Sequence, residues 1–153
     1  MEQIIRHNKD NPAKVFLKRY RALMLRCDAL DHAIAEAHER ATNITVHLTP
    51  DKVQSSGAQD RMAEDAIRAL DAEQMLRETQ EEAKAVLREI LAAIRSVPDE
   101  MQRTVLTMRY VNGYDWLTIQ EKICYEDRMP FVLHGRALEA VNRYLKSVQE
   151  NAV

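Results

Sequence analysis

A set of basic side chains that could bind nucleic acid lies near the N-terminus. Lys14, Lys18 and Arg21 are separated by four and three residues, so a helix would place them on one face. Such a face could bind nucleic-acid phosphates without reading sequence, and its binding would weaken steeply with salt. The same spacing also suits a solvated face that only keeps the segment soluble. Both interpretations are open at the level of sequence.

Catalytic and metal chemistry find little support in the sequence. Cys27 and Cys124 are isolated thiols, which indicates neither a disulfide framework nor a metal knuckle. The five histidines include no His-x-x-x-His pair. The sequence contains no glycine-rich phosphate loop, and Glu81 and Glu82 occupy neighbouring helical positions that do not face each other. We therefore expect no enzymatic activity, no cofactor and no metal site.

The composition is typical of long helices. The 153 residues include only 3 Gly and 4 Pro, with 5% aromatic and 30% charged residues, and they lack the β-branched and aromatic runs of strands. The sequence shows no apolar run that approaches the ~20 residues of a membrane span. The charged start MEQIIRHNKDNP does not fit a signal peptide. An all-α protein of the cytoplasm is expected.

Charge is distributed unevenly along the chain. Residues 1–21 carry six Lys and Arg against two acids, residues 22–95 carry nine against fourteen, and residues 96–153 carry seven against eight. A nucleic-acid-binding domain usually has a clear basic excess, because phosphate neutralisation supplies much of the affinity. The C-terminal segment lacks that excess.

Apolar spacing predicts two long helices, at about residues 12–41 and 57–95, joined by a loop at about residues 43–56. Heptad seams run along both helices, with a phase shift between Leu70 and Leu76. The β-branched residues 42–46 should end the first helix. The first seam is Ala13, Phe16, Tyr20, Leu23, Cys27, Leu30, Ile34, Ala37 and Ala41, and the second is Leu76, Gln80, Ala83, Leu87, Ile90, Ile94 and Val97.

Two such helices predict a long antiparallel hairpin, a coiled-coil arm over residues 1–96 that precedes a second domain at residues 97–153. The seams could pair within one chain or between two chains, and a homodimer through the arm is expected. Gln80 could set the register, or it could be a tolerated residue at the edge of the seam. The sequence does not indicate a role for the loop segment 51–56.

Three shorter helices, the last two spaced as a helix-turn-helix, are expected in the second domain. The first begins at Pro98 and ends at Asn112-Gly113, and Asp115 caps the second. Residues 124–127 form the turn, and Asp127 caps a final helix through about Ser147. The residues expected to face inward from the second of these helices are Leu117, Ile119 and Ile123, beside Trp116.

The segment VPDEMQRTVLTMRYVNGYDWLTIQEKI (residues 97–123) resembles the start of region 4 of sigma-70-class transcription factors. The shared pattern is an apolar residue and Pro at the start of a helix that ends in Leu-Arg-Tyr, followed by Gly, an aromatic residue and Ile. The continuation HGRAL (residues 134–138) is similar to phage- and prophage-encoded region-4-like proteins. The matching positions are Val97, Pro98, Arg103, Val105, Leu106, Arg109, Tyr110, Gly113, Trp116 and Ile119.

The resemblance implies a DNA-binding transcription regulator of phage or prophage origin, acting in the cytoplasm of a bacterial host. Its last helix would enter the major groove. Since region 4 also binds RNA polymerase, a protein-interaction module with little or no DNA binding is the alternative. The positions implied at the DNA surface are Arg128, Phe131, Val132 and Arg136, with Lys14, Lys18 and Arg21 of the arm as further contacts.

The start of the last helix departs from a usual DNA-reading surface. Glu126 and Asp127 would face phosphates unfavourably, and Pro130 suits a helix only within its first turn. Phe131 and Val132 could be buried by a local shift of the helix, could contact thymine methyl groups, or could form a protein-docking surface. The turn also carries Gln120 and Cys124, where the resembled family has a small residue and a glycine.

Overall fold

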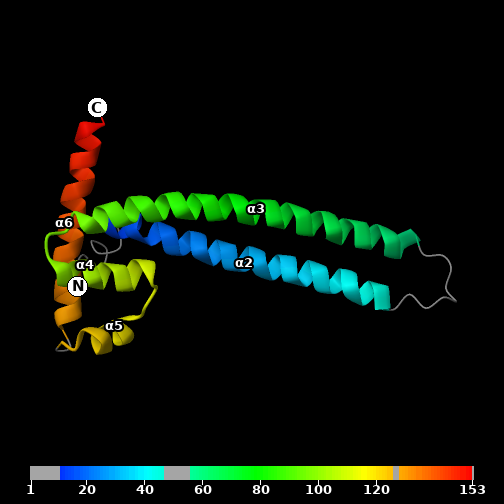
Figure 1. The fold of residues 1–153 in the computed structure, drawn as a ribbon, viewed down its shortest axis with the longest axis horizontal. Helices are drawn as coiled ribbons and strands as arrows, with labels where there is room; N and C mark the ends of the chain where they lie inside the picture. Colours follow the sequence, from blue (N-terminus) through cyan, green and yellow to red (C-terminus); the bar gives the residue numbers. More distant parts are fainter. Residues whose placement is uncertain (1–10, 47–55, 126–127, 153) are drawn as a thin grey trace, which may run out of the picture. The chain divides into compact units, whose positions relative to one another are not determined.

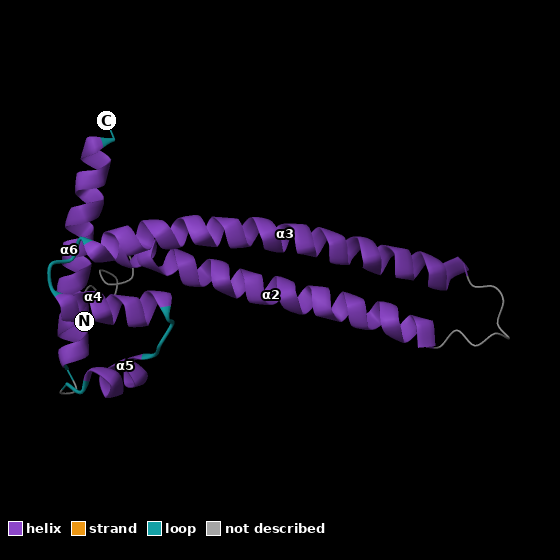
Figure 2. Cartoon of the chain, viewed as in Figure 1, coloured by secondary structure: helices purple, strands orange, loops and turns teal. Residues whose placement is uncertain are grey.

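The computed structural model of the protein describes residues 11–46, 56–125 and 128–152. Every regular element in these ranges is helical, as Figure 2 shows, which confirms the predicted all-α class. In order, the elements are α2 (Pro12–Val46), α3 (Ser56–Arg95), α4 (Glu100–Leu106), the π-helix η1 (Thr107–Val111), α5 (Trp116–Ile123) and α6 (Met129–Asn151).

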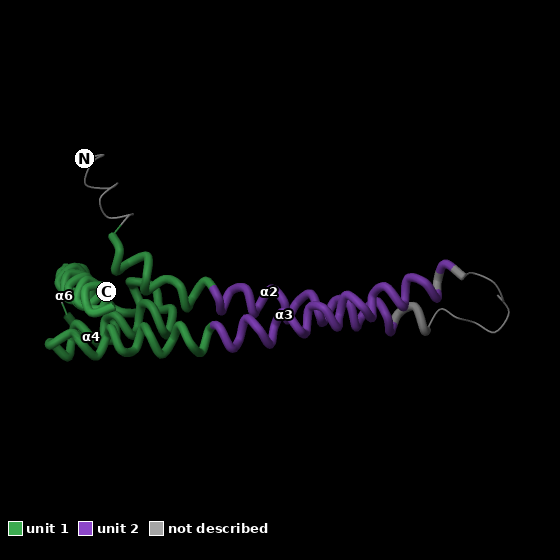
Figure 3. The backbone as a smooth tube through the Cα atoms, turned by 90° about the horizontal axis from the view of Figure 1, so that it is seen from above, with its two compact units in different colours: residues 1–22, 83–153 green, residues 23–82 purple. Residues whose placement is uncertain are grey.

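The chain forms two compact units, which Figure 3 colours separately. Unit 1 comprises Met1–Ala22 and Ala83–Val153, and unit 2 comprises Leu23–Glu82. Both long helices contribute to both units, so the edges of the units do not coincide with the expected domain boundary after residue 96. Within each unit the segments of α2 and α3 run antiparallel as a hairpin (Figure 1).

Helix α2 follows its predicted seam, because every member of the seam is buried or half-buried. Cys27 and Ala37 are buried in unit 2, while Ala13 is fully buried in unit 1. The predicted end near Ala41 is wrong, since the helix continues to Val46. β-branched residues cost a helix only a few tenths of a kcal/mol each, roughly, and the Thr42 hydroxyl donates to the His38 carbonyl at 2.9 Å within the helix.

In unit 2, helix α3 buries small and polar residues rather than large ones. Asp65, Ala69 and Thr79 are buried at spacings that continue the heptad, with Ala72 and Leu76 half-buried between them. Ile67 and Leu70 remain 59% and 64% exposed. The phase shift expected between Leu70 and Leu76 is therefore wrong. Gln80 is exposed, which fits a residue at the edge of the seam.

The start of α2 is capped from two sides in unit 1. The Asn11 Oδ1 atom accepts from the Ala13 amide at 3.1 Å, and the Asn142 Oδ1 atom of α6 accepts from the same amide at 2.8 Å. Asn142 Nδ2 also donates to Asn11 Oδ1 at 3.1 Å. This network anchors the start of α2 on α6 and satisfies an amide that a helix start leaves without a partner.

Acidic residues cap the starts of α4 and α5, and of these caps Asp115 was predicted. Asp99 accepts from the Gln102 amide and Asp115 accepts from the Thr118 amide, both at 2.8 Å. Helix α4 therefore starts at Glu100, two residues after the predicted Pro98. Gly113 has a φ of 76°, as expected for the end of the preceding helix. The predicted cap of the last helix, Asp127, lies outside the described residues.

One small core joins α4, α5 and α6. Val105, Ile119 and Leu133 are buried against each other, one from each helix. Leu117 was expected to face inward, but this prediction is wrong because its side chain is 66% exposed. Two helical positions separate it from Ile119, which places the two side chains on opposite faces of α5. The half-buried residues around this core are Met101, Met108, Tyr114, Trp116 and Ile123.

Helix α6 is longer than predicted, ending at Asn151 rather than near Ser147. Pro130 lies in its first turn, as expected, and is fully buried. None of the helices in the described part of the chain has the length and apolar character needed to span a membrane.

Candidate functional site

The outer face of α6 is the candidate functional site. Leu133, Ala137 and Val141 bury the inner face of the helix, and residues spaced by three and four along the opposite face are exposed. Between residues 128 and 146 the exposed charges on this face are four cations and one carboxylate. We call this surface the α6 outer face. Its members are Arg128, Val132, Gly135, Arg136, Glu139, Arg143 and Lys146.

Two predicted site residues, Arg128 and Arg136, are exposed on this face as expected. Arg143 and Lys146 were missed by sequence reasoning, which concentrated on the start of the last helix. The signal was available, because the two residues follow Arg136 by seven and ten positions and thus share its helical face. The cationic character of α6 therefore continues into its C-terminal half.

Phe131 and Val132 are 52% and 43% exposed. The interpretation that a local shift of the helix buries them is therefore wrong. The Phe131 ring packs at 4.7 Å between centroids against Trp116 of α5, so one side of the ring is covered. Other exposed apolar side chains come from the same part of the chain. With Phe131 and Val132, the residues Leu117, Tyr125 and Met129 make up what we call the α5–α6 apolar surface.

Trp116 connects α5 to the residues behind the site. Its ring meets the His134 ring edge-on at 4.9 Å, and the Arg109 guanidinium carbon lies 5.1 Å from its centroid. Arg109 also donates to the Tyr114 carbonyl at 2.9 Å. These contacts fix the ring that supports Phe131, so the start of α6 rests on a rigid aromatic support.

A buried polar pair lies under α6. The Tyr110 hydroxyl and His134 Nε2 are 2.8 Å apart, and both residues are buried. Burial, followed by the positive charges of Lys14 and Arg109, lowers the pKa of His134 to about 4. Burial also raises the pKa of Tyr110 to about 12. The pair is thus neutral at physiological pH and joins η1 to α6 by one hydrogen bond.

The π-helix η1 positions the side chains that contact Trp116 and His134. The Asn112 amide donates to the Thr107 carbonyl, five residues earlier, at 3.0 Å. The wider turn holds Arg109 and Tyr110 in adjacent positions. From there Arg109 lies over the Trp116 ring and Tyr110 forms its hydrogen bond with His134. Such turns are rare and often occur at functional sites. Here the turn builds the support of α6.

The cationic residues of α2 do not form one uniform face. Lys18 is exposed, whereas Lys14 and Arg21 are half-buried in unit 1. Burial, then the neighbouring charges of Lys18 and Arg109, lowers the pKa of Lys14. The Arg21 guanidinium carbon lies 2.5 Å from where a Cβ atom on Gly113 would be. A purely solvated face is therefore wrong for two of these three residues.

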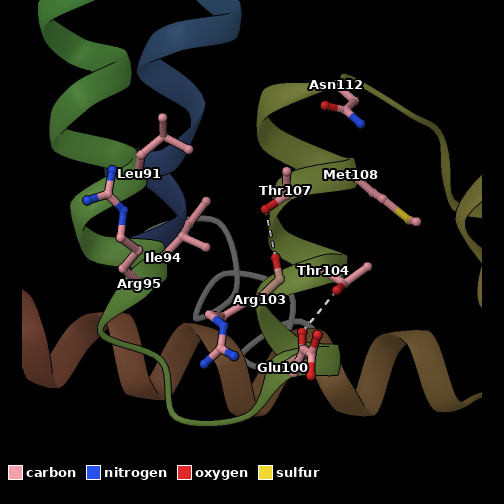
Figure 4. A pocket seen from close by; sticks show the side chains of 9 residues that line it. All are labelled: Leu91, Ile94, Arg95, Glu100, Arg103, Thr104, Thr107, Met108 and Asn112. Atoms are coloured by element: carbon pink, nitrogen blue, oxygen red, sulfur yellow. Dashed lines mark hydrogen bonds between the residues drawn. The ribbon is translucent and has the colours of Figure 1, made fainter.

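An open groove of about 450 Å³ lies between the end of α3 and α4 with η1 (Figure 4). Leu91, Ile94 and Met108 form its apolar part. Arg103 is engaged by the Val97 and Pro98 carbonyls, at 2.7 and 3.0 Å, so it closes the turn between α3 and α4. Of the described residues that line the groove, only Glu100 carries a carboxylate. The lining offers no acid–base pair.

The described residues contain no group of three or more His, Cys, Asp or Glu side chains that could hold a metal ion. Cys27 is buried, and burial, followed by Asp31 and Asp28, raises the pKa of its thiol. Cys124 is exposed and has a φ of 53° at the end of α5, a left-handed conformation that glycine adopts more easily. Cys124 thus forms the C-terminal cap of α5.

Comparisons of the sequence with protein-family models and with curated proteins, and of the structure with solved structures, found no match.

Proposed function

We propose that this protein is a DNA-binding transcription regulator in which α5 and α6 form a helix-turn-helix and α6 is the recognition helix. The observation that carries the proposal is the α6 outer face, with four exposed cations against one carboxylate between residues 128 and 146. Phosphate neutralisation by such a stripe supplies affinity for DNA. In keeping with the sequence resemblance, the proposal includes a phage or prophage origin and action in the bacterial cytoplasm.

The small core under α6 favours this role. Val105, Ile119 and Leu133 lock α4, α5 and α6 together, so a groove-binding helix is held by two others. A recognition helix reads base edges with exposed residues near its start while neighbouring cations hold the phosphates. On α6 the first group is Arg128, Phe131 and Val132. Arginine can read guanine, and apolar side chains can contact thymine methyl groups.

The remaining cations divide into two sets under this proposal. Arg136, Arg143 and Lys146 would bind phosphates along α6, and Lys18, with Lys14 and Arg21 behind it, would add contacts from α2. The sequence places Glu126 and Asp127 just before the helix, and their charges oppose phosphate binding. We therefore expect modest affinity with a strong salt dependence.

A fluorescence-anisotropy titration of the full chain with a labelled random-sequence duplex, at two salt concentrations, tests the proposal. Arg136→Glu and Arg143→Glu should each weaken binding, and each should reduce the slope of log K against log salt by about 1. Arg61→Glu, on the exposed surface of unit 2, is the matched control and should leave the slope unchanged. Absence of binding at low salt, or equal slopes for all variants, would reject a DNA-binding role for α6.

A second candidate function is protein binding, and the α5–α6 apolar surface favours it. Leu117 and Phe131 are more than half exposed, although large apolar side chains usually gather in the core or at an interface. The partner in this alternative is RNA polymerase or another host protein. Phe131→Asp should abolish co-purification with purified bacterial RNA polymerase, whereas Val148→Asp, an equally exposed site farther along α6, should not. Equal capture by both variants would reject this alternative.

We also propose that the protein dimerises through unit 2. The seam of the hairpin is closed within one chain, so pairing must use an outer face, and Ile67 with Leu70 offers one on α3. Light scattering over a wide concentration range should show a dimer that Ile67→Lys dissociates. A wild-type monomer at every concentration would reject dimerisation.

A further inference from the structure

Helix α6 carries a glycine within its outer face. Gly135 is exposed, and a Cβ atom built on it would meet no atom within 4 Å. Glycine is the least favourable residue in a helix interior apart from proline, because it loses the most backbone freedom on folding. An alanine would fit this position and strengthen the helix. The packing of the described residues therefore gives no reason for the glycine.

The other two glycines have local explanations. Gly113 has a φ of 76°, and a Cβ atom there would lie 2.5 Å from the Arg21 guanidinium carbon. Gly57 also has open space, but it lies at the second residue of α3, where a helix end tolerates glycine. Gly135 differs from both, because it lies six residues inside a helix of 23 residues and has an ordinary helical backbone.

The neighbours of Gly135 define a recess on the α6 outer face. Phe131 and Val132 lie one turn before it and Glu139 lies one turn after it, with Arg136 beside it. Because glycine has no side chain, a ligand that touches this face can approach the helix backbone more closely here than at any of its neighbours. The lack of a side chain at Gly135 therefore leaves room for close contact from outside the chain.

We propose that Gly135 is the position of closest approach between α6 and duplex DNA. The cations on the same face select this ligand, since Arg136 adjoins the recess, Arg128 lies two turns before it, and Arg143 and Lys146 continue the stripe. The helix backbone lies against the groove at Gly135, and these arginines bind phosphates or base edges on either side of it. This inference rests on the proposed function and assigns the depth at which α6 enters the groove.

The test compares Gly135→Ala with Gly57→Ala in the full chain. The probe is the duplex of about 20 base pairs that wild-type protein enriches from a random library. Gly135→Ala should raise the Tm by about 2–4 °C, because alanine favours a helix interior, whereas Gly57→Ala at a helix end should change the Tm little. Gly135→Ala should weaken binding about tenfold, since its methyl group must displace a closely packed duplex. Gly57→Ala should bind like wild type.

The outcomes separate this inference from the proposed function. If wild-type protein binds the duplex and Gly135→Ala binds within about twofold of it, the close approach is refuted while DNA binding by α6 stands. If wild-type protein enriches no duplex, both fail. If Gly135→Ala binds DNA normally but loses capture of purified RNA polymerase, the recess receives a protein and the DNA assignment is overturned.

Discussion

The interiors of the two units differ in what they bury. The largest fully buried side chains, among the described residues, all belong to unit 1 and include Leu17, Ile90, Leu106 and Ile119. Unit 2 buries Cys27, small alanines, and the polar Asp65 and Thr79. Because burial of large apolar side chains is the main favourable contribution to folding, unit 1 should hold most of the stability. Unit 2 should open first.

The two units also differ in which side chains they expose on their surfaces. In unit 1 the largest buried side chains are apolar, and the surface carries both the largely cationic α6 outer face and the α5–α6 apolar surface. In unit 2 two large apolar side chains of α3, Ile67 and Leu70, lie outside, while alanine and threonine lie inside. Unit 1 is thus the better packed of the two, and unit 2 is a hairpin that leaves two large apolar side chains of α3 on its outer surface.

Leu106→Ala should give the largest effect and tests where the stability resides. Leu106 is fully buried in unit 1, so the substitution removes apolar burial and leaves a cavity, at a cost of about 3 kcal/mol in the free energy of unfolding. Ile34→Ala, at a half-buried seam position of unit 2, is the matched control and should cost about 1 kcal/mol. Urea unfolding followed by circular dichroism measures both, and equal losses would contradict the contrast.

Sequence reasoning located most of the fold because large residues and caps carry clear patterns. The α2 seam and the cap Asp115 were predicted correctly. The phase shift expected between Leu70 and Leu76 was wrong, because α3 buries small and polar side chains upstream of Leu76 and leaves Leu70 exposed. Alanine and threonine carry little periodic signal, so only the packed structure identifies the seam of α3 there.

The candidate site was predicted only in part. Arg128 and Arg136 were chosen from the resemblance, whereas Arg143 and Lys146 were missed although their spacing to Arg136 places them on the same helical face. The Tyr110–His134 pair could not be predicted, because 24 residues separate its members and a π-turn aligns them. Contacts of this kind depend on tertiary packing, which local sequence patterns do not encode.

A pH titration of stability should give the next largest effect and tests the polar pair inside unit 1. The lowered pKa of His134 means that the folded protein holds fewer protons than the unfolded chain between about pH 4 and pH 6.5. The contribution of neutral His134 to the free energy of unfolding should therefore be fully present above pH 6.5. The free energy of unfolding should fall by up to about 3 kcal/mol as the pH approaches 4. Urea unfolding at several pH values measures this loss.

His134→Gln is the control for that titration, because an amide can still bond to the Tyr110 hydroxyl but does not titrate in this range. The variant should lose stability less steeply between pH 6.5 and pH 4 than the wild type. Parallel pH profiles for the two proteins would assign the acid sensitivity to other groups. If acidification between pH 6.5 and pH 4 unfolded only unit 2, the order of stability inferred for the two units would be reversed.

The smallest expected effects come from a reciprocal exchange between the two interiors. Thr79 is buried in unit 2, and its hydroxyl donates to the Met75 carbonyl at 2.7 Å within its own helix. Thr79→Val removes a buried polar group without leaving a new donor unpaired, so it should stabilise the hairpin by about 0.5 kcal/mol. Val141→Thr in unit 1 makes the opposite change at a fully buried position and should cost about 1–2 kcal/mol.

Hydrogen exchange in unit 2 and urea unfolding of the whole chain measure the two substitutions separately. Slower exchange of the unit 2 amides in Thr79→Val, with no change in unit 1, would mean that the polar seam limits the stability of the hairpin. Destabilisation by Thr79→Val would instead mean that the hydroxyl contributes to the packing of α2 against α3 within unit 2. In that case the small seam residues are a well-fitted interior, and the weakness inferred for unit 2 would have to be withdrawn.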